Sequence, residues 1–307
     1  YEELLNDFES FKPDLVLSST TTSTVTDDLK IINKLKELNP NATFVLKAAL
    51  FYNAPLDLLK GMDLSSIDFL VGGEIEFAVQ PIVQKINSKS NYYKDIPGIF
   101  FKESDSWVMT EFNNWNKEID ELPIPDRSII NNGLYVRPDT GEPQATIATS
   151  RGCPAACIYC LTPTISGKKV RFRSPESVLS ELINCYDKFN IKNFFFKSDT
   201  FTIDKKWVKE VCTLIKQSKL HKKIEWVANS RVKPLEQETL DIMKEAGCWL
   251  VAFGFESGSE ETLKKIKKGA NVENNLIAAE YTKNAGLKLY GFYFGVNSQI
   301  YPHYISS

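Results

Sequence analysis

The stretch QATIATSRGCPAACIYC, residues 144–160, joins a short β-rich run to three cysteines that lie within eight residues. The apolar and β-branched side chains of residues 144–150 predict a strand, and Gly152 and Pro154 favour a turn directly after it. The chain has six cysteines, and none precedes Cys153. The sequence therefore places half of its thiols in one loop at the end of a predicted strand.

Outward from this loop, strands and helices are predicted to alternate. Four further β-rich runs predict strands at residues 193–198, 224–230, 249–256 and 288–296. Helical periodicity predicts helices near residues 175–190, 205–218, 235–246 and 272–285. Five β/α units in succession favour a barrel or partial barrel, whose chemistry lies at the carboxyl ends of the strands. The cysteines follow the first strand, and therefore lie where a barrel carries its active site.

The first 120 residues are predicted to form a separate α/β domain. Short β-rich runs begin at Asp14, Thr43 and Ile67, each followed by a helix-compatible segment, and residues 96–108 predict a hairpin. This alternation predicts a parallel, doubly wound, Rossmann-like sheet. Residues 121–140 are rich in Pro, Gly, Asn and Asp, so we expect a linker there and the barrel over residues 141–307. Because the chain opens on Tyr1 and stops soon after the fifth strand, we expect both domains to be truncated.

The composition excludes several classes of protein. The formal charge is -2 and the pI is about 5.9, and the charges are mixed along the chain, so nothing indicates a nucleic-acid or membrane-surface protein. No apolar run reaches the roughly 18 residues of a membrane span, and the first residues lack the regions of a signal peptide. A few clustered cysteines are typical of metal-binding or catalytic thiols in a reducing compartment. We therefore expect a cytoplasmic protein.

The spacing Cys-x3-Cys-x2-Cys allows three interpretations. An iron–sulfur cubane held by three cysteines leaves one iron open for a further ligand. Zinc in a structural site takes four protein ligands, and only His221 and His303 could complete it from histidine. Unligated thiols are the third possibility. The spacing favours iron–sulfur and leaves the other two open.

Several segments together resemble the radical S-adenosylmethionine enzymes. CPAACIYC, with an aromatic residue before the last cysteine, is similar to the cluster motif of that family. FFFKSDTFT, WVANSRV and VAFGFESGSEETLKKIKKG follow at the second, third and fourth strands of the barrel, and LVGGEIEFAV precedes them. Together they are similar to the subgroup that has an N-terminal cobalamin-binding domain. The resemblance implies a Rossmann-like domain of the cobalamin-binding type, followed by a partial, TIM-like (β/α)6 radical SAM barrel.

The resemblance also implies cofactors, partners and a reaction. Cys153, Cys157 and Cys160 would hold a 4Fe-4S cluster whose open iron is chelated by S-adenosylmethionine. An electron from the cluster would cleave S-adenosylmethionine to a 5′-deoxyadenosyl radical, and cobalamin would deliver a methyl group to a small-molecule substrate. The implied partners are this substrate and an electron donor such as flavodoxin or ferredoxin, with no membrane and no nucleic acid.

Other functions share some of these motifs. A radical cyclase or rearrangement enzyme, resembling anaerobic magnesium-protoporphyrin ester cyclase, would have the same domain order. A non-catalytic metal- or cobalamin-binding protein would have the motifs without the reaction. A methylthiotransferase of tRNA would need a second set of three cysteines ahead of Cys153, and the sequence has none there.

The resemblance assigns five residues to S-adenosylmethionine: Tyr159, Asp199, Arg231, Glu256 and Ser257. Tyr159 would pack near the adenine, or else anchor its loop. Asp199 would bind the methionine amino group, although KSDT departs from the Gly-Gly-Glu form of the family, and helix capping is the alternative. Arg231 is suited to bind a carboxylate of the ligand in bidentate fashion; the alternative is that it forms an ion pair at the protein surface. Glu256 ends an apolar run. Because an acidic side chain is costly to bury without a partner, a contact with the ribose or the methionine moiety is favoured over a structural role.

Six residues are assigned to cobalamin by the same resemblance: Ser19, Thr20, Thr22, Gly72, Gly73 and Glu74. The alternative is a Rossmann-like rim without a ligand. No histidine precedes His221, so no histidine ligand to cobalt is assigned. The basic runs KKIKKG (residues 264–269) and GKKVRFR (residues 167–173) are expected to be solvated. The alternative for the second run is that it approaches an anionic substrate or electron donor. The other cysteines are expected in the core: Cys185, Cys212 and Cys248.

Overall fold

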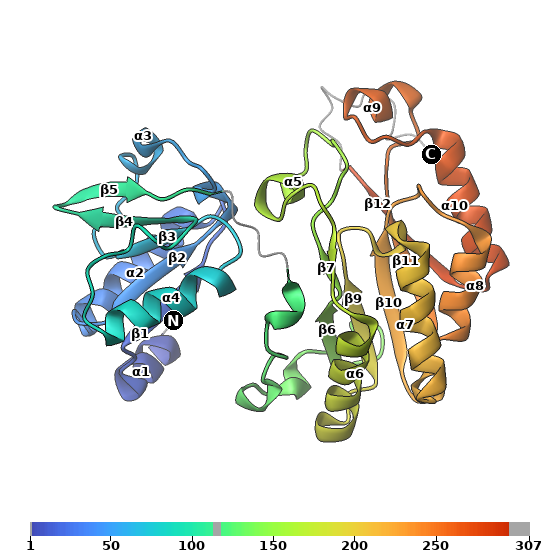
Figure 1. The fold of residues 1–307 in the computed structure, drawn as a ribbon, viewed down its shortest axis with the longest axis horizontal. Coiled ribbons are helices and arrows are strands. Elements are labelled where there is room, and N and C mark those ends of the chain that lie inside the picture. Colours follow the sequence, from blue (N-terminus) through green and yellow to red (C-terminus); the bar gives the residue numbers. More distant parts are fainter. Residues whose placement is uncertain (1, 113–117, 295–307) are drawn as a thin grey trace. The chain divides into compact units, whose positions relative to one another are not determined.

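The chain forms two compact units, each with its own hydrophobic core. The computed structural model describes residues 2–112 and 118–294. The first unit comprises Tyr1–Asn116 and Thr164–Ser166, and the second comprises Lys117–Pro163 and Gly167–Ser307 (Figure 1). Within the described residues, no helix is long and apolar enough to cross a membrane.

The first unit is a five-stranded sheet with helices on both faces. Its helices and strands are α1 (Glu2–Phe11), β1 (Leu15–Ser19), α2 (Val25–Leu38), β2 (Thr43–Lys47), α3 (Leu56–Leu59), β3 (Phe69–Val71), α4 (Glu76–Asn87), β4 (Ile99–Glu103) and β5 (Ser106–Met109). The strand order is β1-β2-β3-β4-β5. Strands β1 to β3 are parallel, whereas β4 and β5 form an antiparallel hairpin that joins the same sheet at β3. The three predicted strands and the hairpin are therefore present.

Alternation along β2 explains the two covered faces. Phe44 and Leu46 are buried in one cluster with Ile32 of α2. Val45, between them, is buried in a second cluster with Ile82 of α4. Because successive residues of a strand point to opposite faces, a continuous apolar run buries both sides of the sheet.

The second unit is a sheet of parallel strands in sequential order. Its helices and strands are β6 (Gln144–Ala148), β7 (Ser150–Arg151), α5 (Thr162–Ile165), β8 (Arg171–Phe172), α6 (Pro175–Phe189), β9 (Asn193–Lys197), α7 (Lys205–Gln217), β10 (Glu225–Ser230), α8 (Gln237–Glu245), β11 (Cys248–Glu256), α9 (Glu260–Lys265), α10 (Val272–Asn284) and β12 (Lys288–Tyr293). The order β6-β9-β10-β11-β12 is parallel throughout. All five strands and four helices that the sequence predicts are present. Residues 295–296 of the last predicted strand lie outside the described residues.

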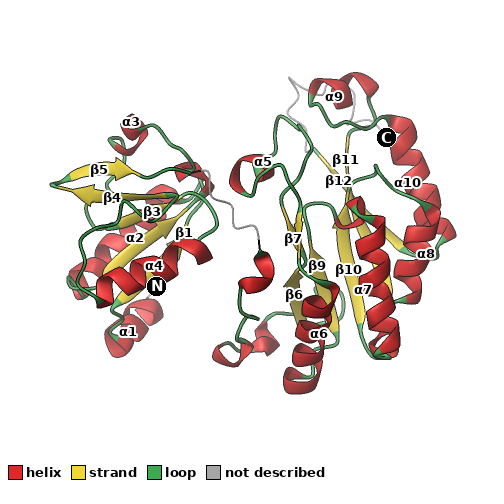
Figure 2. Cartoon of the chain, viewed as in Figure 1, coloured by secondary structure: helices red, strands yellow, loops and turns green. Residues whose placement is uncertain are grey.

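One face of this sheet packs against helices. Helices α6 and α7 lie along the strands in Figure 2, and the core joins their apolar residues to those of α8 and α10. In β6, Ala145 and Ile147 are buried in that core, whereas Thr146 and Ala148 are exposed on the other face. The sheet therefore has one helix-covered side.

The helix boundaries follow the predicted signals. The side chain of Ser174 accepts a hydrogen bond from the backbone N–H of Ser177, and Pro175 is the first residue of α6. Gly247 and Gly286 follow α8 and α10 with φ angles of 96° and 66°, a region that favours glycine.

Residues 121–140, which were predicted as a linker, lie in the second unit and are anchored to it by two buried arginines. Arg127 donates hydrogen bonds to the backbone carbonyl of Thr146, at 3.0 Å, and to Glu181, at 2.7 Å. Arg137 donates to Asn193 and Glu225, both at 2.8 Å. A Pro- and Gly-rich composition indicates turns, but it does not show which side chains a turn buries.

Candidate functional site

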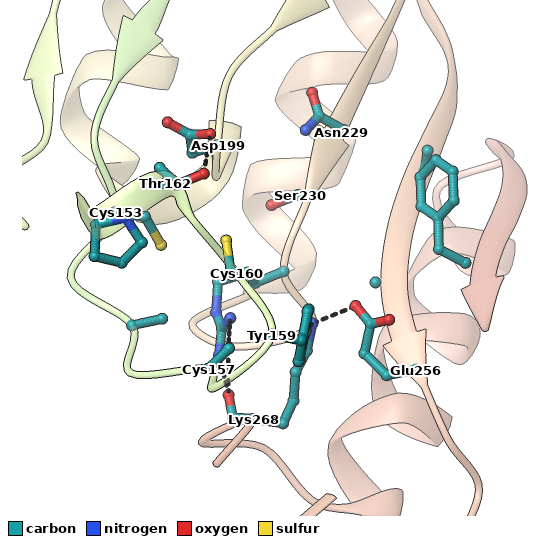
Figure 3. Close-up of a pocket in the computed structure, with 16 residues that line it drawn as sticks. Cys153, Cys157, Tyr159, Cys160, Thr162, Asp199, Asn229, Ser230, Glu256 and Lys268 are labelled. Atoms are coloured by element: carbon teal, nitrogen blue, oxygen red, sulfur yellow. Dashed lines mark hydrogen bonds and ion pairs between the residues drawn. The ribbon is translucent and has the colours of Figure 1, made fainter. Parts of the chain in front are cut away.

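A pocket of about 240 Å³ lies in the second unit, where several strands reach their carboxyl ends (Figure 3). It is lined by the three clustered cysteines and by four of the five residues that the resemblance assigns to S-adenosylmethionine: Cys153, Cys157, Cys160, Tyr159, Asp199, Arg231 and Glu256. These residues come from the loop after β7 and from the ends of β9, β10 and β11. The structure therefore brings together residues that are far apart in the sequence.

The cysteine loop begins with a close backbone crossing at Gly152. This residue has a φ angle of 93°, and a Cβ atom there would lie 2.3 Å from the carbonyl oxygen of Lys169. Only glycine avoids this clash. Next to the crossing, β7 pairs with β8, and the N–H of Cys153 donates to the carbonyl of Gly167 at 3.1 Å. The first cysteine is thus held by the strand pairing just before it and by its own backbone N–H.

The three thiols are unpaired by disulfides, and they do not surround a single ion. Cys153 and Cys157 are buried, and Cys160 is partly exposed. Among the described residues, no three Cys, His, Asp or Glu side chains are arranged to hold one metal ion. A zinc ion needs that convergence, whereas a cubane cluster takes each thiolate on a different iron. The donor set therefore fits a cluster better than zinc, since His221 is absent from the pocket lining and His303 lies outside the described residues.

Asp199 braces the cysteine loop at both ends. Its carboxylate accepts hydrogen bonds from the N–H of Gly152, at 2.9 Å, and from the hydroxyl of Thr162, at 3.1 Å. The alternative of helix capping is wrong, because the cap of α7 is Asp204, whose side chain accepts from the N–H of Trp207. The predicted contact with a methionine amino group stays a prediction.

Arg231 reaches across the pocket to the cysteine loop. Its guanidinium donates to Sγ of Cys157, at 3.3 Å, and to the backbone carbonyl of Lys268. In the described part of the chain it contacts no carboxylate, so the alternative of a surface ion pair is wrong. Its positive charge is therefore available to an anionic group of a ligand.

Glu256 lies opposite the cysteines and is paired with a buried lysine (Figure 3). Its carboxylate is 2.8 Å from Nζ of Lys268, whose side chain is only 4% exposed. The same Nζ donates to the hydroxyl of Tyr159 at 3.2 Å. Glu256 therefore has a charged partner within the chain, and its predicted contact with a ribose or methionine group stays a prediction. Burial, followed by the charge of Glu256, raises the pKa of Tyr159 well above its ordinary value.

Two neighbours shape this pair. Glu256 has a φ angle of 62°, a conformation that non-glycine residues rarely adopt. A Cβ atom on Gly254 would lie 2.5 Å from Oε1 of Glu256 and 2.8 Å from Nζ of Lys268. The bare backbone at Gly254 therefore makes room for both charged groups.

Ser257 is the one predicted S-adenosylmethionine residue that does not line the pocket. It is buried, its hydroxyl accepts from the N–H of Ser259 at 3.1 Å, and its carbonyl accepts from the side chain of Asn275 at 3.1 Å. These bonds hold the connection between β11 and α10. The hydrogen bonds described for Ser257 are therefore to residues of this connection and not to residues of the pocket.

The expectation that the basic runs are solvated is wrong for three residues. Lys268 is 3% exposed, and Arg171 and Arg173 are 7% and 9% exposed. Arg173 forms an ion pair with Glu181, which is buried beside it. Charge patterning failed here because a buried charge is stabilised by one partner on a neighbouring element, which the composition of the basic run itself does not display.

The pocket lining also includes residues to which the sequence assigned no individual role, among them Thr162, Asn229, Ser230, Gly254, Lys268 and Phe292. One signal for Lys268 was available, because a buried glutamate at the end of β11 requires a cation. The run of four lysines after it offered no means to choose among them.

The cobalamin candidates lie in the first unit, at the last residue of β1 and directly after β1 and β3. Thr20 is buried, and its hydroxyl donates to Asp28 of α2 at 2.6 Å. A Cβ atom on Gly72 would lie 2.4 Å from the backbone of Tyr52, so this glycine serves a close chain crossing. Ser19 and Thr22 are exposed, and Gly73 has no atom within 4 Å of an added Cβ. Gly73 and Glu74 line a small cavity of about 30 Å³.

The geometry agrees with the relationships of the chain to known proteins. Residues 147–300, half of the chain, match the radical SAM superfamily. The chain therefore belongs to the radical SAM superfamily.

Individual relatives extend the similarity over both units. An uncharacterized methyltransferase of Pyrococcus horikoshii is 31% identical over 95% of this chain and 62% of the relative. Cytidylyl-2-hydroxyethylphosphonate methyltransferase of Streptomyces wedmorensis is 25% identical over 95% of this chain and 59% of the relative. The chain thus spans about three fifths of the length of these relatives.

A solved structure has the same fold. It is the radical S-adenosylmethionine methyltransferase TsrM of Kitasatospora setae, with cobalamin and a [4Fe-4S] cluster bound. The TM-score is 0.79 at 17% sequence identity, over 95% of this chain and 60% of that one. The mixed α/β fold is therefore shared across both units.

Proposed function

We propose that this chain is the cofactor-binding part of a cobalamin-dependent radical S-adenosylmethionine methyltransferase. The observation that carries the proposal is the pocket itself, where three free thiols lie with Tyr159, Arg231 and Glu256 at the ends of parallel strands. The two methyltransferase relatives and the fold shared with TsrM support methyl transfer and cobalamin.

The proposal gives each unit a role. Residues 1–120 form a Rossmann-like cobalamin-binding domain. Its candidate contacts to cobalamin are Ser19, Thr20, Thr22, Gly72, Gly73 and Glu74, at the ends of β1 and β3. Residues 121–140 connect it to residues 141–307, a partial barrel that holds the remaining cofactors. The parallel order of β6 and β9 to β12 supports the barrel assignment.

The pocket residues have distinct tasks in this proposal. Cys153, Cys157 and Cys160 hold a 4Fe-4S cluster, Tyr159 packs against the adenine, and Arg231 holds the carboxylate of the methionine moiety. When bound, these cofactors supply the electron that cleaves S-adenosylmethionine and the methyl group that is transferred. The protein excludes water and aligns the groups.

Anaerobic reconstitution with iron and sulfide tests the proposal. We expect a brown protein that forms 5′-deoxyadenosine from S-adenosylmethionine and dithionite. The triple Cys153→Ala, Cys157→Ala, Cys160→Ala variant should lose both the colour and the product. Cys185→Ala, a buried cysteine outside the pocket, is the matched control and should keep both. Product formation by the triple variant would refute the assignment.

Methyl transfer and radical cyclisation are separated by a second product. A methyltransferase converts S-adenosylmethionine to S-adenosylhomocysteine when it charges cobalamin, whereas a cyclase needs only 5′-deoxyadenosine chemistry. We expect S-adenosylhomocysteine from the cobalamin-loaded chain. A small-molecule methyl acceptor and an electron donor of the flavodoxin or ferredoxin class complete the proposal. Loss of cobalamin on gel filtration would favour a simpler radical enzyme.

A further inference from the structure

A basic hollow lies on the second unit, outside the pocket that holds the cysteines. It has a volume of about 500 Å³ and is lined by the exposed lysines Lys233, Lys264 and Lys267, with Glu260 as the only acidic residue of the lining. In the described part of the chain, none of these three lysines has an ion pair or a side-chain hydrogen bond. The basic hollow therefore carries a net positive charge that the described residues do not neutralise.

The loop that carries Lys267 touches the cysteine loop. The backbone N–H of Ile158 donates to the carbonyl of Ile266 at 3.1 Å. Sγ of Cys157 donates to the carbonyl of Lys268 at 3.9 Å (Figure 3). The residues before and after Lys267 thus contact consecutive residues of the cysteine loop, so the basic hollow adjoins the segment that carries the thiols.

The cysteine loop itself presents apolar side chains to solvent. Ile158 is 66% exposed and Leu161 is 58% exposed, whereas Cys153 and Cys157 are buried. Single exposed aliphatic residues are ordinary on a protein surface. Here they lie on a loop bordered by unpaired lysines, and an apolar centre with a polar rim is the composition of a protein–protein interface.

The start of α10 is already capped, which argues against a small phosphate ligand in the basic hollow. The N–H of Val272 donates to Glu260, and the N–H of Asn274 donates to Asn271, both at 2.9 Å. A helix N-terminus binds phosphate through such N–H groups when they are free. Exposed lysines instead attract and orient a partner of opposite charge. The basic hollow therefore fits the acidic surface of a protein.

We propose that the basic hollow and the exposed side of the cysteine loop form the docking surface for an acidic protein that carries single electrons. This inference rests on the proposed function, which requires an electron from outside the chain and leaves the place of its delivery open. In each transfer the carrier loses one electron and the cluster gains it. For a flavodoxin, the anionic flavin hydroquinone becomes the neutral semiquinone, and no proton moves.

The test measures how fast such a carrier reduces the reconstituted chain. Flavodoxin hydroquinone is mixed anaerobically with the wild type or with the triple variant Lys233→Gln, Lys264→Gln, Lys267→Gln, and the loss of cluster absorbance is followed by stopped flow. We expect the second-order rate constant of the variant to fall roughly 10-fold or more at low salt. The difference should vanish at 1 M salt, where charges are screened beyond about 3 Å.

A binding measurement complements the rates. Oxidised flavodoxin transfers no electron, so its affinity reports docking alone. Its dissociation constant, measured by flavin fluorescence anisotropy, should be higher for the triple variant than for the wild type.

Three controls separate docking from other effects. Reduced methyl viologen is a small cation that needs no docking surface, so it should reduce the triple variant at least as fast as the wild type. Lys265→Gln removes an exposed lysine that is paired with Glu261 at 2.7 Å, and should react as the wild type does. The double variant Lys168→Gln, Lys169→Gln removes the exposed lysines of the other basic run and should also keep the wild-type rate.

The outcomes distinguish this inference from the proposed function. A wild-type rate of the triple variant with flavodoxin would overturn it, and so would a loss confined to the double variant. Equal slowing with methyl viologen would also overturn it, because the substitutions would then have damaged the cluster and not the docking. Failure of the wild-type chain to form 5′-deoxyadenosine with reduced methyl viologen would instead reject the proposed function.

Discussion

Asp199 links the cysteine loop to the end of β9 through two hydrogen bonds. It accepts from residues on both sides of the cysteines, the N–H of Gly152 and the hydroxyl of Thr162. A carboxylate in this position fixes the span of the loop. It therefore affects how well three thiols fit a cluster, even though it contributes no thiol of its own.

Asp199→Ala should lower the iron content of the reconstituted chain. Loss of the two hydrogen bonds also costs about 1–3 kcal/mol of unfolding free energy. Asp204→Ala, five residues on, removes the cap of α7 and costs about 1 kcal/mol without touching the loop. Iron per chain and urea denaturation measure both effects. Equal iron content in the two variants would contradict the role of Asp199.

Gly254 is the second residue whose substitution has a defined effect. Gly254→Ala places a methyl group against Glu256 and Lys268, and overpacking costs about 1–3 kcal/mol. We expect lower stability and weaker binding of S-adenosylmethionine. Gly61→Ala, where the nearest atom would be 3.8 Å away, is the control and should change neither. Thermal denaturation and equilibrium dialysis provide the readouts, and unchanged binding by Gly254→Ala would count against a ligand site at this pair.

Sequence reasoning found the residues of the site whose chemistry shows in a local motif. The cysteine spacing and the aromatic and acidic residues at strand ends pointed to one pocket, and the structure gathers them there. It did not single out Lys268, and it did not indicate that Ser257 is absent from the pocket lining. Both depend on partners 12 to 18 residues away or more, Glu256 and Asn275, and on the path of an irregular loop that no periodicity encodes.

At the scale of elements, periodicity predicted the five strands of the parallel sheet and helices α6, α7, α8 and α10 to within a few residues, but not the short elements β7, β8, α5 and α9. β6 alternates buried and exposed residues, and Ser174, Gly247 and Gly286 mark helix ends by local chemistry. The composition of residues 121–140 predicted a linker, because turn-forming residues indicate irregular backbone. Its attachment through Arg127 and Arg137 is set by long-range ion pairs instead.

The start of α6 predicts a dependence of stability on pH. Burial opposes ionisation of Asp120, but hydrogen bonds from Ser174 and the charge of Arg173 hold its pKa below the ordinary value of 3.8. A lowered pKa in the folded state stabilises the fold above pH 3.8, and this contribution is lost as the pH falls through the folded pKa. The stability difference between wild type and Asp120→Asn should therefore shrink below pH 3.8.

Urea denaturation between pH 7 and pH 3 measures this difference. Asp187→Asn, which alters an exposed carboxylate on α6, serves as the control and should show little difference at any pH. A difference between wild type and Asp120→Asn that stayed constant down to pH 3 would show that Asp120 is not selectively ionised in the folded chain.

At the scale of the whole molecule, the two units have separate hydrophobic cores. Phe44 is 1% exposed in the core of the first unit. Phe44→Ala should lower the unfolding free energy of the first unit by about 3–5 kcal/mol. On heating, the iron-dependent colour of the second unit should disappear at the same temperature in the variant as in the wild type. Scanning calorimetry with visible absorbance distinguishes the two transitions. A parallel fall in both temperatures would show that the units unfold together.

The sequential order of β6 and β9 to β12 has a consequence during translation. Each strand pairs with one already made, so the sheet can grow as the chain leaves the ribosome. Cys157, however, contacts the backbone of Lys268, 111 residues later. At about 5–20 residues per second, that support emerges roughly 5–20 s after the thiols. The thiols of the nascent chain are therefore made before the pocket around them is complete.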